Sequence, residues 1–294
     1  MAIESFNFFY GIGVPTDEKR AMELCLKSSE KGNKLALSFK KFFGWNTEKD
    51  IKSSFELLNE ILNENDFSCV EEYSHCLNLV AFNYKHGEND FIEKNIEKSI
   101  ELFEKAIKLG NSTSMNNLAH FYQNGEEYGF EKNIKKAIEL YERAVDLKHS
   151  SAMYNLGFLY TKGEIGVVEK DIEKALELYQ LAIQYNNSYA LTNLAQIYET
   201  GDGVERNINK AMELYERSIK FNDSTAMNNL AFIYQKGQHG VEKNIQKALE
   251  LYERAVELEN PFAMNNLGQI YENGTDGIEK DWKKQYSFMK VLQN

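Results

Sequence analysis

Apolar residues in the second half of the chain recur at helical spacing. Segments 133–145, 171–183 and 244–258 each carry one apolar stripe in the order i, i+3, i+4, i+7, which predicts an amphipathic helix. In the last of them the stripe consists of Ile245, Ala248, Leu249, Tyr252, Ala255 and Val256. Each segment begins with Asn or Asp, whose side chain accepts hydrogen bonds from the free amides of a first helical turn.

Another amphipathic segment precedes each of these helices. Residues 226–237 (AMNNLAFIYQKG) place Ala226, Leu230, Ile233 and Tyr234 on one side of a predicted helix that ends at a glycine. Nearly the same phrase occurs at 152–163, 190–201 and 263–274. The chain is therefore a series of predicted helical hairpins.

The spacing of these hairpins is almost constant. Successive terminal glycines from Gly87 to Gly274 are 38, 38, 38, 36 and 37 residues apart. From the Asn or Asp at the start of each second helix to the next glycine the distance is always 30 residues between Asn95 and Gly274. A constant body with a variable connector indicates a rigid repeated unit with a tolerant surface loop.

One helical hairpin cannot bury its apolar face alone, whereas stacked copies can. We therefore predict an all-α fold: a right-handed α/α superhelical solenoid of stacked antiparallel helix pairs, forming a single array over 1–294 with about seven to eight repeats. The predicted repeats are the divergent 1–35 and 36–75, the regular 76–113, 114–151, 152–189, 190–225 and 226–262, and the capping 263–294.

The two ends of the array depart from the regular period. The steps Gly11–Gly44 and Gly44–Gly87 are 33 and 43 residues, and we place the extra residues in 62–76. They form a longer second helix, an extra turn or a break in the superhelix. At the other end, Trp282, Tyr286 and Phe288 replace the regular helix and predict a terminal cap.

These residues resemble the Sel-1-like repeat family, a longer cousin of the tetratricopeptide repeat, over nearly the whole chain. The family motif is roughly A-x-x-x-L-G-x-x-Y-x-x-G-x-G-V-x-x-D-x-x-K-A. Its first half matches Ala152, Leu156, Gly157, Tyr160 and Gly163, and its second half matches Gly201, Gly203, Val204, Asn207, Lys210 and Ala211. The chain often has Asn for the motif's Asp and Ala for its second Gly, changes that affect capping and close packing.

The resemblance implies a non-enzymatic scaffold or adaptor that binds a protein or peptide on its concave face. Members serve membrane-associated ubiquitin ligases, activate cell-wall synthases, or act as bacterial signalling and host-interaction factors. An alternative is the cysteine-rich subgroup associated with β-lactam binding and hydrolysis, in which a disulfide staples each repeat. Only Cys69 and Cys76 have such a spacing here, so we expect free thiols and do not transfer that activity.

The first helices also carry positions that differ from copy to copy. They are spaced i, i+4, i+7 and so share one face. We expect a partner-binding groove there, with Tyr154, Phe158 and Phe232 as apolar anchors; the alternative is that these residues are merely exposed. The full set is Asn116, His120, Gln123, Tyr154, Phe158, Thr161, Thr192, Gln196, Glu199, Asn228, Phe232, Gln235, Asn265, Gln269 and Glu272.

One asparagine precedes the leucine of each first helix. These residues are Asn117, Asn155, Asn193, Asn229 and Asn266. Their amides either grip the backbone of an extended peptide, bridge adjacent repeats or satisfy loop carbonyls. Invariance between copies favours a packing role, because specific recognition varies along a groove.

Charge and composition narrow the partner class. The net charge is −11, and lysines alternate with glutamates, as in 93–108, so no basic stripe for nucleic acid is present. No apolar run is long enough to span a membrane. The start lacks the basic region of a signal peptide. We expect a cytoplasmic monomer that binds a protein partner, binds no nucleic acid and does not insert into membranes.

The sequence offers little support for catalysis. The histidines His75, His86, His120, His149 and His239 do not cluster at metal-ligand spacing. No nucleophile elbow, phosphate loop or HExxH motif occurs. We therefore expect no enzyme activity, no catalytic residues, no metal and no cofactor.

Overall fold

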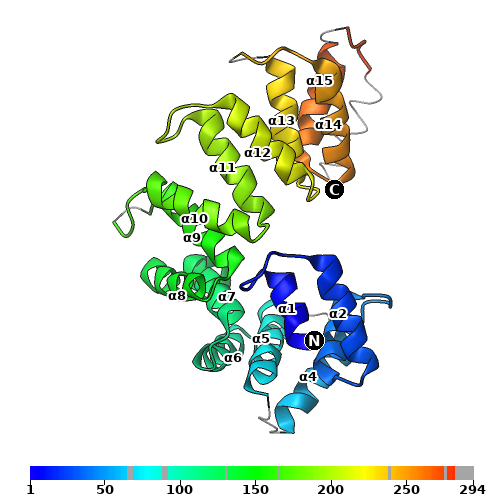
Figure 1. Cartoon of the computed structure of the whole chain (residues 1–294), viewed down its shortest axis with the longest axis vertical. Helices are drawn as coiled ribbons and strands as arrows, with labels where there is room; N and C mark the ends of the chain where they lie inside the picture. Colours follow the sequence, from blue (N-terminus) through cyan, green and yellow to red (C-terminus); the bar gives the residue numbers. More distant parts are fainter. Residues whose placement is uncertain are drawn as a thin grey trace. The chain divides into compact units, whose positions relative to one another are not determined.

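The structure is a computed structural model that describes residues 1–64, 69–87, 92–129, 131–164, 166–237, 240–274 and 277–281. Over these residues the chain is all-helical, and successive antiparallel helix pairs pack on one another (Figure 1). The predicted fold class is confirmed. The predicted cap residues Trp282, Tyr286 and Phe288 lie outside the described residues, as does His239.

Each hairpin contains a first and a second helix. The first helices are α1 (Ala2–Tyr10), α3 (Lys34–Phe43), α5 (Val70–His86), α7 (Ser112–Gln123), α9 (Ser150–Lys162), α11 (Ser188–Thr200), α13 (Ser224–Lys236) and α15 (Pro261–Asn273). The second helices are α2 (Glu18–Glu30), α4 (Ile51–Asn63), α6 (Ile96–Lys108), α8 (Ile134–Asp146), α10 (Ile172–Gln184), α12 (Ile208–Ile219) and α14 (Ile245–Glu257). A short 3₁₀ helix, η1 (Gly125–Tyr128), follows α7.

The predicted capping residues start the second helices. The side chain of Asn244 accepts a hydrogen bond from the Lys247 amide at 3.0 Å, and Asp171 accepts one from the Lys174 amide at the same distance. Substituting such a cap by Ala typically costs about 1 kcal/mol. The repeated Asn/Asp therefore fixes where each second helix begins, and the constant 30-residue body follows from it.

Small and aromatic residues of the second helices fill the space between hairpins. Ala137, Ala175, Ala211 and Ala248 are fully buried, and each lies four residues before a fully buried tyrosine. The alanines let a neighbouring helix approach closely, while each tyrosine fills the space next to the contact. These tyrosines are Tyr141, Tyr179, Tyr215 and Tyr252.

The irregular segment 62–76 is partly described. The second helix α4 has 13 residues, the same length as α6 and α8, so a longer second helix is wrong. Instead the following first helix, α5, has 17 residues against 12 in α7 and 13 in α9. Cys69 is the N-cap of this longer helix, and His75 and Cys76 on it are buried. Cys25, Cys69 and Cys76 are free thiols.

The chain divides into two compact units, Met1–Asn187 and Ser188–Asn294. In the N-terminal unit, α1 packs against α5, the first helix of the third hairpin, as well as against its own partner α2 (Figure 1). Phe6 of α1 stacks on His75 with ring centroids 4.5 Å apart and contacts Phe39 at 4.2 Å. This aromatic cluster gives the divergent N-terminal repeats a core of their own.

Residues 11–16 (GIGVPT), which we call the strap, run from the end of α1 to turns much later in the chain. The Gly13 amide donates to the Lys148 carbonyl at 3.1 Å, and the Ser150 amide donates to the Gly11 carbonyl at 3.3 Å. Further along, the Thr16 amide donates to the Tyr185 carbonyl at 3.0 Å. Repeats of a solenoid normally contact only their neighbours, whereas this strap joins the first repeat to two later turns.

Gly11 is where the strap passes closest to the turn. Its φ is +63°, and an added Cβ would lie 2.5 Å from Ser150 Oγ and 2.7 Å from Thr16 Cγ2. Gly13 has nearly the same φ, +68°, but open space around the position of a Cβ. We expect Gly11→Ala to lower the free energy of unfolding by about 2–4 kcal/mol, because it adds a clash to the cost of a left-handed alanine.

Gly13→Ala is the matched control, because it carries only the backbone cost of about 1–2 kcal/mol. The measurement is urea unfolding of both variants beside the parent chain. Equal losses in the two variants would contradict the close contact between Gly11 and Ser150.

Candidate partner-binding face

The 15 residues predicted to form a groove all lie on the first helices α7, α9, α11, α13 and α15. Each helix contributes a first, a middle and a third position, one turn apart. The first positions are Asn116, Tyr154, Thr192, Asn228 and Asn265; the middle ones are His120, Phe158, Gln196, Phe232 and Gln269; the third ones are Gln123, Thr161, Glu199, Gln235 and Glu272. The structure gives these three rows different surroundings.

The first row is largely used within the protein. Asn116 accepts a hydrogen bond from the Asn155 amide at 2.9 Å, and Asn228 accepts one from Asn266, also at 2.9 Å. Thr192 is only 6% exposed, and its hydroxyl donates to the Asp223 carboxylate at 2.7 Å. The structure thus places Thr192 in the packing between repeats rather than on an open surface.

The third row pairs with the buried tyrosines of the second helices. The Tyr141 hydroxyl donates to Gln123 Oε1 at 2.8 Å, and the Tyr252 hydroxyl donates to Gln235 Oε1 at 2.9 Å. The same bond joins Tyr215 to Glu199 at 2.6 Å and links Tyr179 with Thr161 at 3.0 Å. The sequence does show a tyrosine at the same place in each of these second helices. Its periodicity predicts a buried ring but does not predict the hydrogen bond that the hydroxyl makes.

The middle row is the most accessible of the three. Phe232 is 42% exposed, with the Lys236 ammonium 5.1 Å from its ring centroid. Phe158 is half-buried, with Lys162 at 5.7 Å from its ring and Tyr154 at 6.4 Å. A cation over an aromatic face adds roughly 0.5–1 kcal/mol at an exposed site and leaves the other face of the ring open to a partner.

The repeated asparagines bridge neighbouring first helices. Asn117 of α7 donates to Asn78 of α5 at 3.1 Å, a bond equivalent to those of Asn155 and Asn266. Asn229 instead donates to the Tyr215 hydroxyl at 3.3 Å. These amides are therefore part of the contact between repeats, the packing role that their invariance favoured.

Two histidines of the N-terminal unit are buried as neutral imidazoles. Burial lowers the pKa of His75 and of His149 to about 4. His149 caps α9, because its Nδ1 accepts from the Ala152 amide at 3.3 Å, while its Nε2 has no hydrogen-bond partner among the described atoms. On the candidate face, burial and the nearby Lys85 charge lower the pKa of His120.

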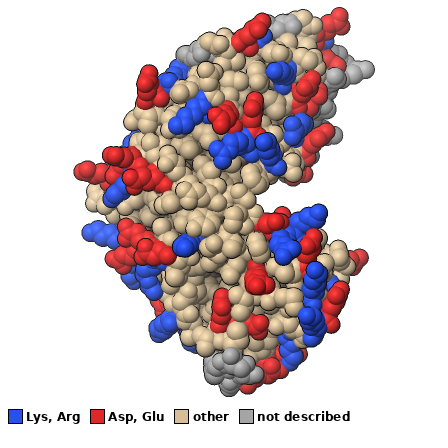
Figure 2. Space-filling view, viewed as in Figure 1, with Lys and Arg blue, Asp and Glu red and all other residues tan. Residues whose placement is uncertain are grey.

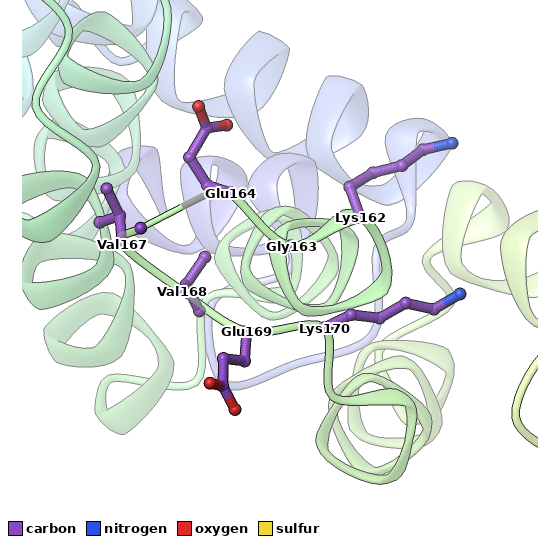
Figure 3. A pocket seen from close by; sticks show the side chains of 8 residues that line it. Lys162, Gly163, Glu164, Val167, Val168, Glu169 and Lys170 are labelled. Carbon is purple, nitrogen blue, oxygen red and sulfur yellow. The ribbon is translucent and has the colours of Figure 1, made fainter.

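A cleft of about 540 Å³ lies under the loop between α9 and α10, lined by residues 162–164 and 166–170. In Figure 3 the carboxylates of Glu164 and Glu169 point away from each other, and Lys162 and Lys170 extend to another side. Charged groups that diverge in this way do not assemble a catalytic constellation. Among the described residues, no group of three or more metal-ligating side chains is close enough to hold an ion.

Two smaller clefts recur at equivalent places beside the second helices. One, of about 460 Å³, is lined by Tyr122 and Lys136, and the other, of about 340 Å³, by Tyr234 and Lys247. In both, the lysine lies over the tyrosine ring, at 5.0 and 5.1 Å from its centroid. Because the same pair recurs from repeat to repeat, we assign these clefts to the scaffold.

On the face shown in Figure 2, basic and acidic side chains alternate and no continuous basic stripe crosses it. None of the described helices combines the length and the apolar character that crossing a bilayer requires. The alternating charge on the face in Figure 2 gives no support to phosphate backbones as a ligand.

Comparison with known proteins identifies the repeat. The family model described as Sel1 repeat matches seven segments: 5–33, 74–111, 112–149, 150–184, 188–220, 224–260 and 261–285. The chain belongs to the Sel1 repeat family. Sel1 repeat proteins are typically protein-interaction scaffolds. No match was found among curated proteins.

Comparison with solved structures found proteins of similar fold. A Sel1 repeat protein from Oxalobacter formigenes is 29% identical, with a TM-score of 0.67, over 74% of this chain and 84% of that one. A protective antigen of uropathogenic Escherichia coli strains is 26% identical, with a TM-score of 0.70, over 97% of this chain and 59% of that one. An immunity protein from Pseudomonas aeruginosa is 22% identical, with a TM-score of 0.53, over 75% and 81%.

We expect the stability of this Sel1 repeat protein to depend on pH through the buried residues His75 and His149. Because their folded-state pKa lies below the ordinary value of 6.5, the unfolded chain binds the protons first. The stability from neutral imidazoles is present above pH 6.5 and is lost as the pH falls from 6.5 toward 4. We expect a loss of up to about 1.4 kcal/mol per pH unit for each histidine, measured by urea unfolding between pH 7.5 and 5.

His149→Asn is the matched variant for this titration. Asn111 and Asn260 cap α7 and α15 at the same position, so the variant keeps a capping side chain and loses the titrating group. Its stability should fall with pH about half as steeply as that of the parent. An unchanged slope would exclude His149 as a source of the effect.

The tyrosine hydroxyls behind the third row should contribute measurably to stability. We expect Tyr141→Phe and Tyr252→Phe each to lower the free energy of unfolding by about 1 kcal/mol, because each removes one hydrogen bond and keeps the ring. Tyr198→Phe is the control: its hydroxyl only accepts from Lys210 at an exposed site, and its loss should cost less than about 0.5 kcal/mol. Thermal unfolding of the three variants measures the three losses of stability. A larger loss in Tyr198→Phe than in the other two variants would contradict the prediction.

Proposed function

We propose that this Sel1 repeat chain is a non-enzymatic scaffold that binds a protein or peptide partner across the first-helix face of its repeats. The middle row carries the proposal. His120, Phe158, Gln196, Phe232 and Gln269 remain at least partly accessible, and they differ in chemistry from one repeat to the next. Packing constrains the rows on either side, so selection for a partner can act on the middle row at little cost in stability.

The chemistry of the row favours a protein over other ligands. Aromatic residues such as Phe158, Phe232 and Tyr154 provide the anchors typical of protein interfaces, and amide side chains such as Gln196 and Gln269 offer both donors and acceptors. Mixed surface charge gives no support to a nucleic-acid ligand. The hydrolase alternative gains no support either, because the described residues bring no nucleophile, base and oxyanion donors together.

The test compares capture of partners by two forms of the chain. We expect a protein recovered from source-cell lysate by the parent chain to be lost with the Tyr154→Ala, Phe158→Ala, Phe232→Ala variant, because the apolar anchors at the centre of an interface carry most of its binding energy. Recovery is read by mass spectrometry, and unchanged helicity by circular dichroism shows that the variant folds.

A matched control removes apolar surface elsewhere. Val167 in the α9–α10 loop and Leu181 on α10 are exposed to a similar degree as Phe232, so Val167→Ala, Leu181→Ala should capture the same protein as the parent. Equal recovery by all three forms would place the binding site off the first-helix face.

A further inference from the structure

His149 lies at the centre of the contact between the strap and the α8–α9 turn. Its backbone forms an isolated antiparallel bridge with Ile12 of the strap. On one side of it, the Lys148 carbonyl accepts from the Gly13 amide at 3.1 Å. On the other side, the Ser150 amide donates to the strap backbone at 3.3 Å. Three consecutive residues of the turn therefore hold the strap, and the middle one is a histidine.

The side chain of His149 is enclosed at this contact. His149 is 1% exposed, and its ring stacks on that of Tyr10, the last residue of α1, with centroids 6.5 Å apart. The Ser150 hydroxyl donates to the Tyr10 carbonyl at 3.2 Å and so fixes the end of α1 at the turn. The imidazole is thus shielded from water while the strap is in place.

The hydrogen bonds of the imidazole determine which of its nitrogens carries the proton. Nδ1 accepts from the Ala152 amide at 3.3 Å and thereby caps α9. An accepting ring nitrogen carries no proton, so the proton of the neutral ring is on Nε2. Nε2 has no hydrogen-bond partner among the described atoms. The cap therefore requires a neutral imidazole.

A second proton is incompatible with this arrangement. It would bind to Nδ1 and turn that nitrogen into a donor facing the donor amide of Ala152, so the cap would be lost. The ring would also carry a positive charge in a buried site. A buried charge is unstable unless a partner or water compensates it. The charged ring is therefore stable only where it reaches water.

The strap and the helices beside it bring no compensating charge to the ring. Residues 11–16 contain no ionisable side chain. From α8 and the turn, Asp146 and Lys148 are exposed to solvent. From α1, burial raises the pKa of the Tyr10 hydroxyl, so this group stays neutral.

On α7 and α9, the polar groups near His149 are hydroxyls. Asn111, the residue equivalent to His149 one repeat earlier, donates to the hydroxyl of Ser74 at 3.1 Å. In the same register His149 faces Ser112 of α7, and Ser150 follows it on α9. A hydroxyl is not ionised at these pH values. Burial, rather than a neighbouring charge, accordingly lowers the pKa of His149 to about 4.

We propose that His149 is a pH-sensitive switch for the strap: when its imidazole gains a second proton, the strap leaves the α8–α9 turn while the helix pairs stay stacked. The strap opens first because it is a loop held there by a few backbone hydrogen bonds, whereas α9 packs on both α8 and α10. Opening breaks the link between the first hairpin and this turn. The switch does not involve the first-helix face, so it stands whether or not that face binds a partner.

The sign of the effect follows from the two protonation states. The closed strap binds the second proton with a pKa of about 4, and an open strap leaves His149 near the ordinary value of 6.5. Closure is therefore fully stabilised above pH 6.5 and loses that stability as the pH falls toward 4. Between pH 7.5 and 5.0 the ratio of open to closed strap rises roughly thirtyfold.

The test is hydrogen exchange of the full chain, read residue by residue by NMR and corrected for the pH dependence of the intrinsic rate. We expect the protection of the Gly13 and Ser150 amides to fall roughly thirtyfold between pH 7.5 and 5.0, because both amides donate across the contact. The Ala137 amide of α8 and the Asp17 amide of the first hairpin donate elsewhere, so their protection should change less than about threefold.

His149→Asn is the matched variant. Asparagine keeps a capping side chain, as Asn111 does in α7, and does not titrate, so strap protection should change less than about twofold between the two pH values. His75→Gln removes the other histidine of this unit whose pKa is lowered to about 4 and should leave the full response.

A measurement on the parent chain keeps the test valid if a variant does not fold. The ¹⁵N shifts of the His149 ring report its protonation, which should follow the same pH dependence as the loss of protection at Gly13. A ring that charges while Gly13 stays protected would overturn the proposal.

Three other outcomes also overturn it. Equal protection of the strap amides at pH 7.5 and 5.0 would show that the strap does not respond to acid. The same response in His149→Asn as in the parent would assign the effect to another group. Simultaneous loss at Gly13 and Ala137 would show that acid unfolds the unit as a whole, with no separate opening of the strap.

Discussion

Each helical hairpin of this protein folds because the next hairpin covers its apolar face. The contact consists of fully buried alanines that let helices approach and fully buried tyrosines that fill the space beside them, repeated from Ala137 and Tyr141 to Ala248 and Tyr252. A hairpin that loses its neighbour exposes this surface, so stability accumulates along the array rather than in one central core. Everything else in the structure is arranged around that constraint, including which side chains are free to differ.

The packing between helices also engages side chains of the candidate binding face. Hydroxyl groups of buried tyrosines on the second helices bind third-row residues such as Gln123 and Gln235, while asparagines that join neighbouring repeats use much of the first row. The middle row, with two phenylalanines, a histidine and two glutamines, stays at least partly exposed. Under the proposed function, substitutions in this row change the specificity for a partner and leave the packing between repeats intact.

The N-terminal unit uses two of its turns for long-range contacts. There the chain lays its own strap across them, and α1 reaches the third hairpin, so residues far apart in sequence become neighbours. His149, at the first of these turns, is buried, and its Nε2 has no hydrogen-bond partner among the described atoms. Long-range closure thus adds contacts beyond those between neighbouring repeats of the first unit, in which burial lowers the pKa of His149.

The sequence alone determined the helices, their caps, the period and the family, because these depend on interactions between residues close together in the chain: the spacing of apolar positions, an Asn or Asp at a helix start, and a glycine at a helix end. It also located the variable face. It did not separate the three rows, because a tyrosine at a fixed place has the same period whether its hydroxyl is unused or binds Gln123. For the extra residues of 62–76 it left three alternatives, one of them a longer second helix. In the structure, part of these residues lengthens the first helix α5 instead. Only the tertiary structure decided that the strap of residues 11–16 meets Lys148 and Tyr185, since backbone hydrogen bonds between residues more than 130 positions apart leave no periodic trace in the sequence.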